Sequence, residues 1–169
     1  TNEIYATTAR VYPSIGLSVF IQKQQNKFRW NAGYSLNNIT RPKQSFKDNN
    51  AVVLDVRHAI QASARIPLNS QYEVEALSLF QLQGKMKELV LGSRAYCKLP
   101  SEKWESQRVF AGVHGRFRDA GWFEMGAEYN EWRVGMSYDL NTSTLRPAST
   151  GRGGLEFSLV YIVPPKPKP

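Results

Sequence analysis

The sequence predicts an all-β protein, an antiparallel transmembrane β-barrel of outer-membrane type in which about nine strands can be recognised. Three observations support this fold class. Apolar and polar side chains alternate along many segments, several of these segments reach about ten residues, and their polar faces are rich in Ser, Asn, Gly, Gln and Arg. A period of two residues is typical of β-strands. A tilted strand needs about 9–11 residues to cross a bilayer.

The clearest alternation lies in Phe28–Asn38, where aromatic and aliphatic side chains face one way and Arg, Asn, Gly and Ser face the other. The polar loops and turns between such segments divide the rest of the chain in the same manner. The predicted strands are Tyr12–Gln22, Phe28–Asn38, Val52–Ile66, Tyr72–Gln83, Lys87–Leu99, Arg108–Arg118, Trp122–Tyr129, Trp132–Leu140 and Gly154–Ile162.

Two predicted hairpins determine which residues face each other. The first has a three-residue turn at Asp119–Gly121, whose final glycine suits the left-handed conformation, and the second has a two-residue turn at Asn130-Glu131. Opposite charges on facing strands stabilise a sheet. We therefore predict a charge ladder that braces the barrel interior, with solute selection in a pore as the alternative. The turns set Arg116 opposite Glu124 and Glu128 opposite Arg133.

The same alternation is compatible with a soluble β-sandwich, so the two folds have to be separated. The outward face of a soluble sandwich should be rich in Lys and Glu, and its strands should average five or six residues. Aromatic residues near strand ends instead suggest the aromatic girdles of a membrane barrel. These residues are Phe28, Tyr72, Tyr96, Trp122, Tyr129, Trp132, Tyr138 and Tyr161.

Composition and charge exclude several classes of function. The net charge of +8 is spread along the chain rather than clustered, so nucleic-acid binding is not expected. The single Cys97 rules out an intramolecular disulfide framework and a multi-cysteine metal site. The two histidines, His58 and His114, lie in no catalytic or metal-binding motif. We predict no catalytic, cofactor-binding or metal-binding residues.

Loop lengths predict the orientation of the chain. Outer-membrane barrels keep short turns and the C-terminus in the periplasm and longer loops outside. Counted back from Tyr161, the two longest predicted loops, Thr40–Asn50 and Asn141–Gly153, both fall outside. The first strand then begins on the outer side, so at least one further strand is expected upstream of Thr1. We assign residues 1–163 to the barrel, as the C-terminal portion of a larger one, and residues 164–169 to a Pro/Lys-rich periplasmic tail.

The end of the chain carries a pattern that resembles a known family. Its residues include Gly135, Tyr138, Asp139, Gly151, Gly153, Glu156 and Tyr161, and the segment Asn37–Phe46 resembles the family's mid-chain strand and loop. This is the PorP/SprF family, the outer-membrane proteins of type IX secretion and gliding-motility systems in Bacteroidetes-type bacteria. The resemblance covers about the last third of the chain closely and the middle loosely, as in the C-terminal half of a family member.

The resemblance implies a non-enzymatic component of the bacterial outer membrane that supports secretion or surface display of substrate proteins. Its partners would be secretion-system proteins, the secreted surface substrate and outer-membrane lipid, with no cofactor and no nucleic acid. A passive outer-membrane porin is the alternative function, because it shares the fold. Basic residues in the last loop and the tail are candidates for partner binding: Arg146, Arg152, Lys166 and Lys168.

Overall fold

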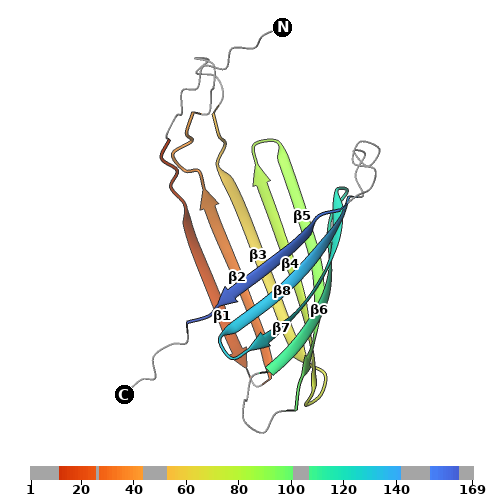
Figure 1. Cartoon of the computed structure of the whole chain (residues 1–169). Coiled ribbons are helices and arrows are strands. Elements are labelled where there is room, and N and C mark those ends of the chain that lie inside the picture. The colour runs from red at the N-terminus through yellow and green to blue at the C-terminus, as the bar shows by residue number, and fades with distance from the viewer. Residues whose placement is uncertain (1–11, 26, 44–52, 101–106, 142–152, 164–169) are drawn as a thin grey trace.

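The computed structural model describes residues 12–25, 27–43, 53–100, 107–141 and 153–163. They form one antiparallel sheet of nine strands, which follow one another in sequence order (Figure 1). No helix within these ranges is long and apolar enough to cross a membrane. The strands are β1 (Leu17–Gln25), β2 (Phe28–Asn37), β3 (Arg57–Pro67), β4 (Tyr72–Gln83), β5 (Met86–Lys98), β6 (Gln107–Arg116), β7 (Ala120–Tyr129), β8 (Trp132–Asn141) and β9 (Leu155–Tyr161).

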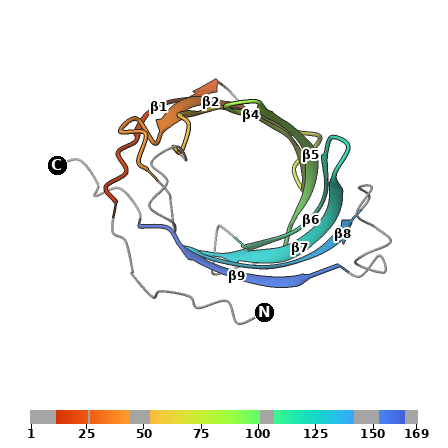
Figure 2. The ribbon, with the colours of Figure 1, turned by 90° about the horizontal axis from the view of Figure 1, so that it is seen from above.

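The sheet curls into a partial cylinder, as the view from above shows (Figure 2). Each strand is hydrogen-bonded to its neighbours along the chain, and no backbone pairing within the described ranges joins β1 to β9. The sheet is therefore strongly curved but not closed. This architecture confirms the predicted all-β, antiparallel, barrel-type fold and the number of strands.

The two ends of the curved sheet differ in their connections. We call the end with the β4–β5 turn at Gly84-Lys85 and the β6–β7 turn at residues 117–119 the upper rim (Figure 1). We call the opposite end, with the turns at residues 68–71 and 130–131, the lower rim. β8 ends at the upper rim and β9 begins there, so the chain between Asn141 and Leu155 starts and finishes at that rim.

Two strands begin later than the alternation predicts. Regular pairing of β1 starts at Leu17 rather than Tyr12, because β2 leaves the sheet at Asn38, which has a left-handed backbone with φ of 58°. β3 starts at Arg57, and among the described residues shortly before it Lys43 and Val53 form an isolated bridge. The alternation of side chains in the sequence thus extends past the residue at which backbone pairing with a neighbouring strand stops.

The β6–β7 register differs from the predicted one. Arg116 pairs with Ala120, and Glu124 pairs with Gly112, so the predicted pairing of Arg116 with Glu124 is wrong. The turn comprises residues 117–119, and Arg118 rather than glycine takes the left-handed conformation, with φ of 64°. The second hairpin is as predicted. Tyr129 pairs with Trp132 and Glu128 with Arg133, across a turn in which Asn130 has φ of 52°.

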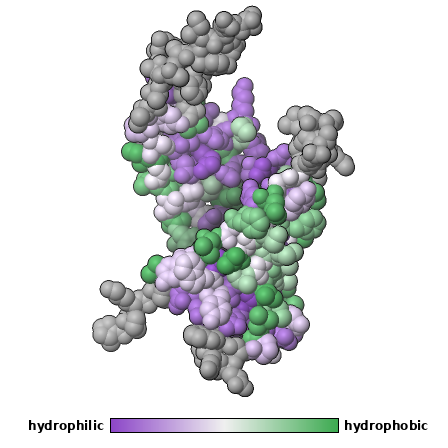
Figure 3. Space-filling model, viewed as in Figure 1, coloured by the Kyte–Doolittle hydropathy of each residue, from purple (hydrophilic) through white to green (hydrophobic). Residues whose placement is uncertain are grey.

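The two faces of the sheet have opposite character. Outward-facing residues of β1 and β9 are apolar and highly exposed, with 66% of Val19 and 77% of Phe157 accessible. In Figure 3, hydrophilic residues gather toward the upper rim, and apolar residues gather over the outer side of β8 and β9. Among the described residues, the buried hydrophobic and charged side chains are Tyr96, Phe110 and Glu75, all on the inner face. A water-soluble sandwich would instead bury its apolar face between sheets.

Candidate functional site: an ionic network on the inner face

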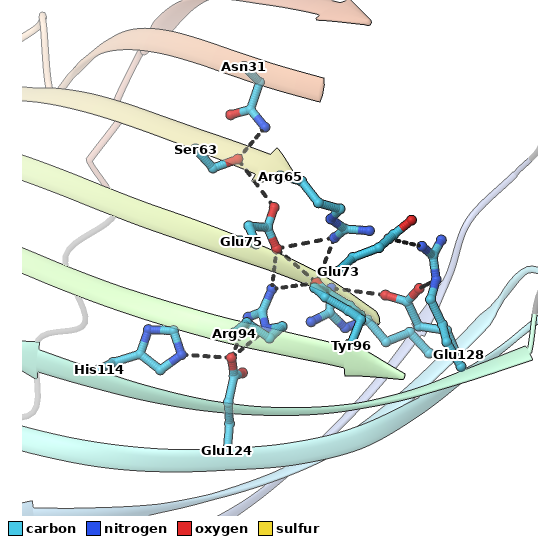
Figure 4. Close-up of polar contacts among 12 residues, drawn as sticks. Asn31, Ser63, Arg65, Glu73, Glu75, Arg94, Tyr96, His114, Glu124 and Glu128 are labelled. Atoms are coloured by element: carbon cyan, nitrogen blue, oxygen red, sulfur yellow. Dashed lines mark hydrogen bonds and ion pairs between the residues drawn. The ribbon is translucent and has the colours of Figure 1, made fainter. Parts of the chain in front are cut away.

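Strand register places alternating charges at one level across the inner face. The Cα partners run from Arg65 on β3 to Glu75 on β4 and Arg94 on β5, then through β6 to Glu124 on β7. Since side chains alternate along each strand, all four point into the interior of the curved sheet (Figure 4). The period-two pattern therefore creates a continuous ionic network from residues far apart in sequence.

Glu75 is the centre of this network. Only 7% of its surface is exposed, and its carboxylate accepts hydrogen bonds from Arg65 at 3.1 Å, Arg94 at 3.2 Å, the Tyr96 hydroxyl at 2.8 Å and Ser63 at 3.3 Å. A buried charge needs this degree of pairing, because an ion removed from water loses its hydration. The two guanidinium groups and the hydroxyl replace that hydration.

A second carboxylate extends the network toward β7 and β8. Glu124 contacts Arg94 at 2.5 Å and His114 at 2.7 Å, and the His114 ring stacks on Trp122 with ring centroids 5.0 Å apart. Arg94 thus bridges Glu75 and Glu124, which lie on strands separated by β5 and β6. Charge-assisted contacts of this kind are stronger than hydrogen bonds between neutral groups.

A third group of charges lies closer to the lower rim. Glu73 pairs with Lys98 at 3.0 Å and with Arg108 at 3.2 Å, and Arg108 also contacts Glu128 at 2.5 Å. Arg133 completes the group at 3.6 Å from Glu128. Glu73, Glu75 and Glu128 are therefore each shared by two cations, and Glu124 is shared by Arg94 and His114. Together the groups link six consecutive strands, β3 to β8.

Two aromatic rings fill the space between these charges. Tyr96 is 1% exposed and Phe110 is 5% exposed, and their ring centroids are 5.8 Å apart. The Arg65 guanidinium lies 4.0 Å from the Tyr96 centroid, and that of Arg133 lies 4.4 Å from the Phe110 centroid. Cations above aromatic faces gain further electrostatic stabilisation. The rings therefore hold the cations in place as well as excluding water.

Glycines on the inner face make room for these side chains. A Cβ on Gly112 would lie 2.8 Å from Oε1 of Glu124 and 2.9 Å from the backbone oxygen of Ser93. The missing side chain lets Arg94 and Glu124 meet across β6. A Cβ on Gly126 would lie 2.5 Å from Cζ of Phe110 and closer still to the backbone oxygen of Val134. Gly126 thus provides the surface on which the Phe110 ring packs.

We expect Gly126→Ala to lower the free energy of unfolding by about 1–3 kcal/mol, because the added methyl group overpacks the Phe110 site. Urea-induced unfolding of protein refolded into lipid vesicles measures the change. Gly115→Ala is the matched control, since a Cβ on Gly115 would have no atom within 4 Å. Equal stability of both variants would contradict the assignment of Gly126 to a packing role.

The four residues of the predicted charge ladder are distributed differently. Glu124, Glu128 and Arg133 belong to the network, whereas Arg116 lies at the upper rim and pairs with Asp119 at 2.9 Å and Glu88 at 3.6 Å. The alternation sets each of the four on the inner face but does not identify their partners. A role for the ladder in bracing the barrel stays a prediction.

Sequence reasoning missed the most buried members of the network. Tyr96, predicted to lie in an aromatic girdle, instead points into the interior toward the charged groups (Figure 4). Trp122, also predicted to lie in a girdle, stacks on His114 on the same face. The sequence contained the information needed to place Tyr96 on the inner face, because the period of two sets it on the same face as Arg94 and Lys98. The importance of Glu75 had no comparable signal, since its partners come from other strands.

The polar groups of the network bind mainly to one another within the part of the chain that the structure describes. No group of three or more His, Cys, Asp or Glu residues there could hold a metal ion. His58 lies on the outer face and contacts the Tyr34 hydroxyl at 2.8 Å, far from the interior network. Both oxygens of Glu75 and one oxygen of Glu124 are already engaged by neighbouring side chains.

Some of the residues predicted to belong to the family pattern or to bind partners lie within the described ranges, and others do not. Gly135, Tyr138 and Asp139 lie on β8, and Glu156 and Tyr161 lie on β9, paired with it. Gly153 lies two residues before that strand, and its described neighbours include Asp139 and Tyr138. The remaining predicted residues lie outside the described ranges: Arg146, Gly151, Arg152, Lys166 and Lys168.

Comparison with known proteins identifies the family. Residues 1–161 match the family model described as type IX secretion system membrane protein PorP/SprF. Searches of curated proteins and of solved structures found no significant match. The matched range includes all nine strands and the whole ionic network. The chain therefore belongs to the PorP/SprF family of type IX secretion system membrane proteins.

Proposed function

We propose that this chain is a non-enzymatic outer-membrane β-barrel component of a type IX secretion or gliding-motility system. In this role it supports secretion or surface display of substrate proteins and contacts the periplasmic machinery. The observation that carries the proposal is the family match over residues 1–161. The two faces of the sheet support it, because an apolar outer face and a charged inner face suit a strand-built wall in lipid.

Deletion of the gene tests the proposal directly. Loss of the chain should reduce the amount of secreted and surface-displayed substrate proteins, and expression of the chain should restore it. Fractionation should recover the chain in the outer membrane. A passive porin, the alternative with the same fold, would conduct ions steadily in planar lipid bilayers and would leave protein secretion unchanged when deleted. Steady conductance with normal secretion would overturn the proposal.

We further propose that the two ends of the barrel have separate partners. The chain between β8 and β9 begins and ends at the upper rim, whereas β9 ends at the lower rim. The tail contains four prolines and two lysines, and proline-rich segments lose little conformational entropy on binding. Arg146 and Arg152 would contact the surface substrate, and Lys166 and Lys168 would contact periplasmic components.

We expect deletion of residues 142–152 to weaken capture of the surface substrate and deletion of residues 164–169 to weaken capture of periplasmic components. Pull-downs from cells that carry each deletion measure both partners. Neutral variants with Gln at Arg146 and Arg152, or at Lys166 and Lys168, separate the effect of charge from that of chain length. The idea of two separate partners fails if both deletions lose the same partner, or if neither loses any.

A further inference from the structure

A cavity of about 430 Å³ opens on the inner side of the upper rim, away from the ionic network. It lies between the start of β3, the β4–β5 hairpin and the β6–β7 turn. This is the end of the molecule at which Figure 3 shows hydrophilic residues gathering. We call this cavity the rim pocket. Its size is in the range of pockets that hold small ligands or a few side chains of a peptide.

The rim pocket has an excess of positive charge. Four cationic and two acidic residues line it, and Arg116 engages both acids, Asp119 at 2.9 Å and Glu88 at 3.6 Å. Arg57 and Arg118 form no ion pair with any residue that the structure describes. The pocket therefore presents guanidinium groups whose charge is not compensated, which favours an anionic ligand.

The backbone at Arg118 suggests that its side chain has a role. Arg118 occupies the left-handed region with φ of 64°, and the turn is closed by a hydrogen bond from the Asp119 amide to the Arg116 carbonyl at 3.1 Å. Glycine adopts this conformation with less strain than arginine. The Arg118 guanidinium lies 5.4 Å from the Phe117 ring centroid. Strained backbone positions cluster at functional sites, and this one places a charged side chain in the lining of the rim pocket.

Apolar side chains stand beside these cations. Met86 is 77% exposed and Phe117 is 69% exposed, and both line the rim pocket. Methionine adapts to varied partners, and an exposed aromatic ring beside arginine is common at protein interfaces. A free inorganic anion would use the guanidinium groups alone. A peptide with acidic and apolar residues would use both kinds of side chain.

We propose that the rim pocket binds an acidic segment of a secreted protein, with carboxylates at Arg57 and Arg118 and an apolar side chain against Met86 and Phe117. The inference rests on the proposed role in protein secretion, which favours a polypeptide over a polysaccharide or lipid headgroup. It adds a location and a ligand chemistry to that role. The pocket would hold the segment at the upper rim by attraction between opposite charges. A high salt concentration should therefore weaken binding.

The test uses the full chain in a neutral detergent and a fluorescein-labelled peptide in which aspartates alternate with phenylalanines. Fluorescence anisotropy should show binding that weakens roughly tenfold or more when asparagine replaces aspartate, since two charge-assisted contacts are lost. Arg57→Gln and Arg118→Gly should each weaken binding of the acidic peptide severalfold. Glycine readily adopts the left-handed conformation that Arg118 has, so Arg118→Gly should keep the turn intact while it removes the guanidinium.

Arg29→Gln is the matched control, because Arg29 is on the inner face at the level of Arg65 and far from the rim pocket along the strands. Equal weakening by Arg29→Gln would mean that only net charge matters and would overturn the proposal. Equal binding of the asparagine peptide, no binding at all, or equal competition by inorganic phosphate at the same charge concentration would also overturn it. Normal secretion after gene deletion would instead contradict the proposed function, whatever the binding result.

Discussion

Replacing Glu75 with alanine is expected to lower the free energy of unfolding by about 3–5 kcal/mol, a large effect for a single side chain. The substitution leaves Arg65 and Arg94 mostly buried without their shared carboxylate, with 13% and 12% of their side-chain surfaces exposed. Removing one partner of a buried ion pair leaves an uncompensated charge in a poorly hydrated site. Urea-induced unfolding from lipid vesicles, followed by fluorescence of the four tryptophans, measures the change.

Glu88→Ala is the control for this prediction. Glu88 is also an inward-facing glutamate, but its contact with Arg116 is longer, at 3.6 Å, and 35% of its side chain is exposed. Partly exposed ion pairs contribute about 0–1 kcal/mol, so this variant should unfold nearly like the parent. Glu75→Gln should fall between the two, because its single amide oxygen can still accept one of the two hydrogen bonds that Tyr96 and Ser63 donate to different oxygens of Glu75. Equal losses for the two alanine variants would refute the central role of Glu75.

Arginine in place of Ala32 is expected to cost about 2–4 kcal/mol when the protein is refolded into a bilayer, provided that Ala32 lies near the midplane. Ala32 is midway along β2 on the outer face, where its pairs are Ile21 on β1 and Ala62 on β3. A guanidinium there would have to leave water for hydrocarbon.

Ala59→Arg is the control variant. It shows whether the loss of stability depends on where the arginine lies or only on the addition of a charge. Ala59 faces the interior at the level of Ser35 and Gln81, among polar side chains. Arginine there can remain hydrated, so the stability should change little. Folding efficiency and urea stability in lipid vesicles of defined thickness compare the two variants. Similar costs at Ala32 and Ala59 would argue against contact of the outer face with lipid.

The alternation of side chains by itself determined the number of strands and the two faces of each strand. The clearest case is β2, predicted as Phe28–Asn38 and found at Phe28–Asn37. The turn at Asn130-Glu131 was also predictable, because a two-residue connection leaves only one register for β7 and β8. These features depend on residues that are neighbours in sequence, so local pattern is sufficient to define them.

The register of β6 and β7 required the tertiary structure. The predicted and observed pairings place residue 124 or residue 120 opposite Arg116, a shift of four residues. An even shift keeps every side chain on its original face, so alternation cannot distinguish the two registers. The conformational freedom of glycine favoured Gly121 as the left-handed residue of the turn, but Arg118 has that conformation. The register that forms is the one that brings Glu124 into contact with Arg94 and His114.

The ionic network also combines features that the local sequence determines with features that only the tertiary structure determines. The sequence alone sets Glu75, Arg94 and Glu124 on inward faces, but each could pair with charges on either neighbouring strand. Only the curved sheet decides that Arg94 reaches Glu124 across β6, because Gly112 leaves the intervening space open. Faces follow from the local geometry of one strand, whereas partners follow from the summed register and curvature of six strands. Charge pairing is a property of that assembled surface, and no single strand contains the information that specifies it.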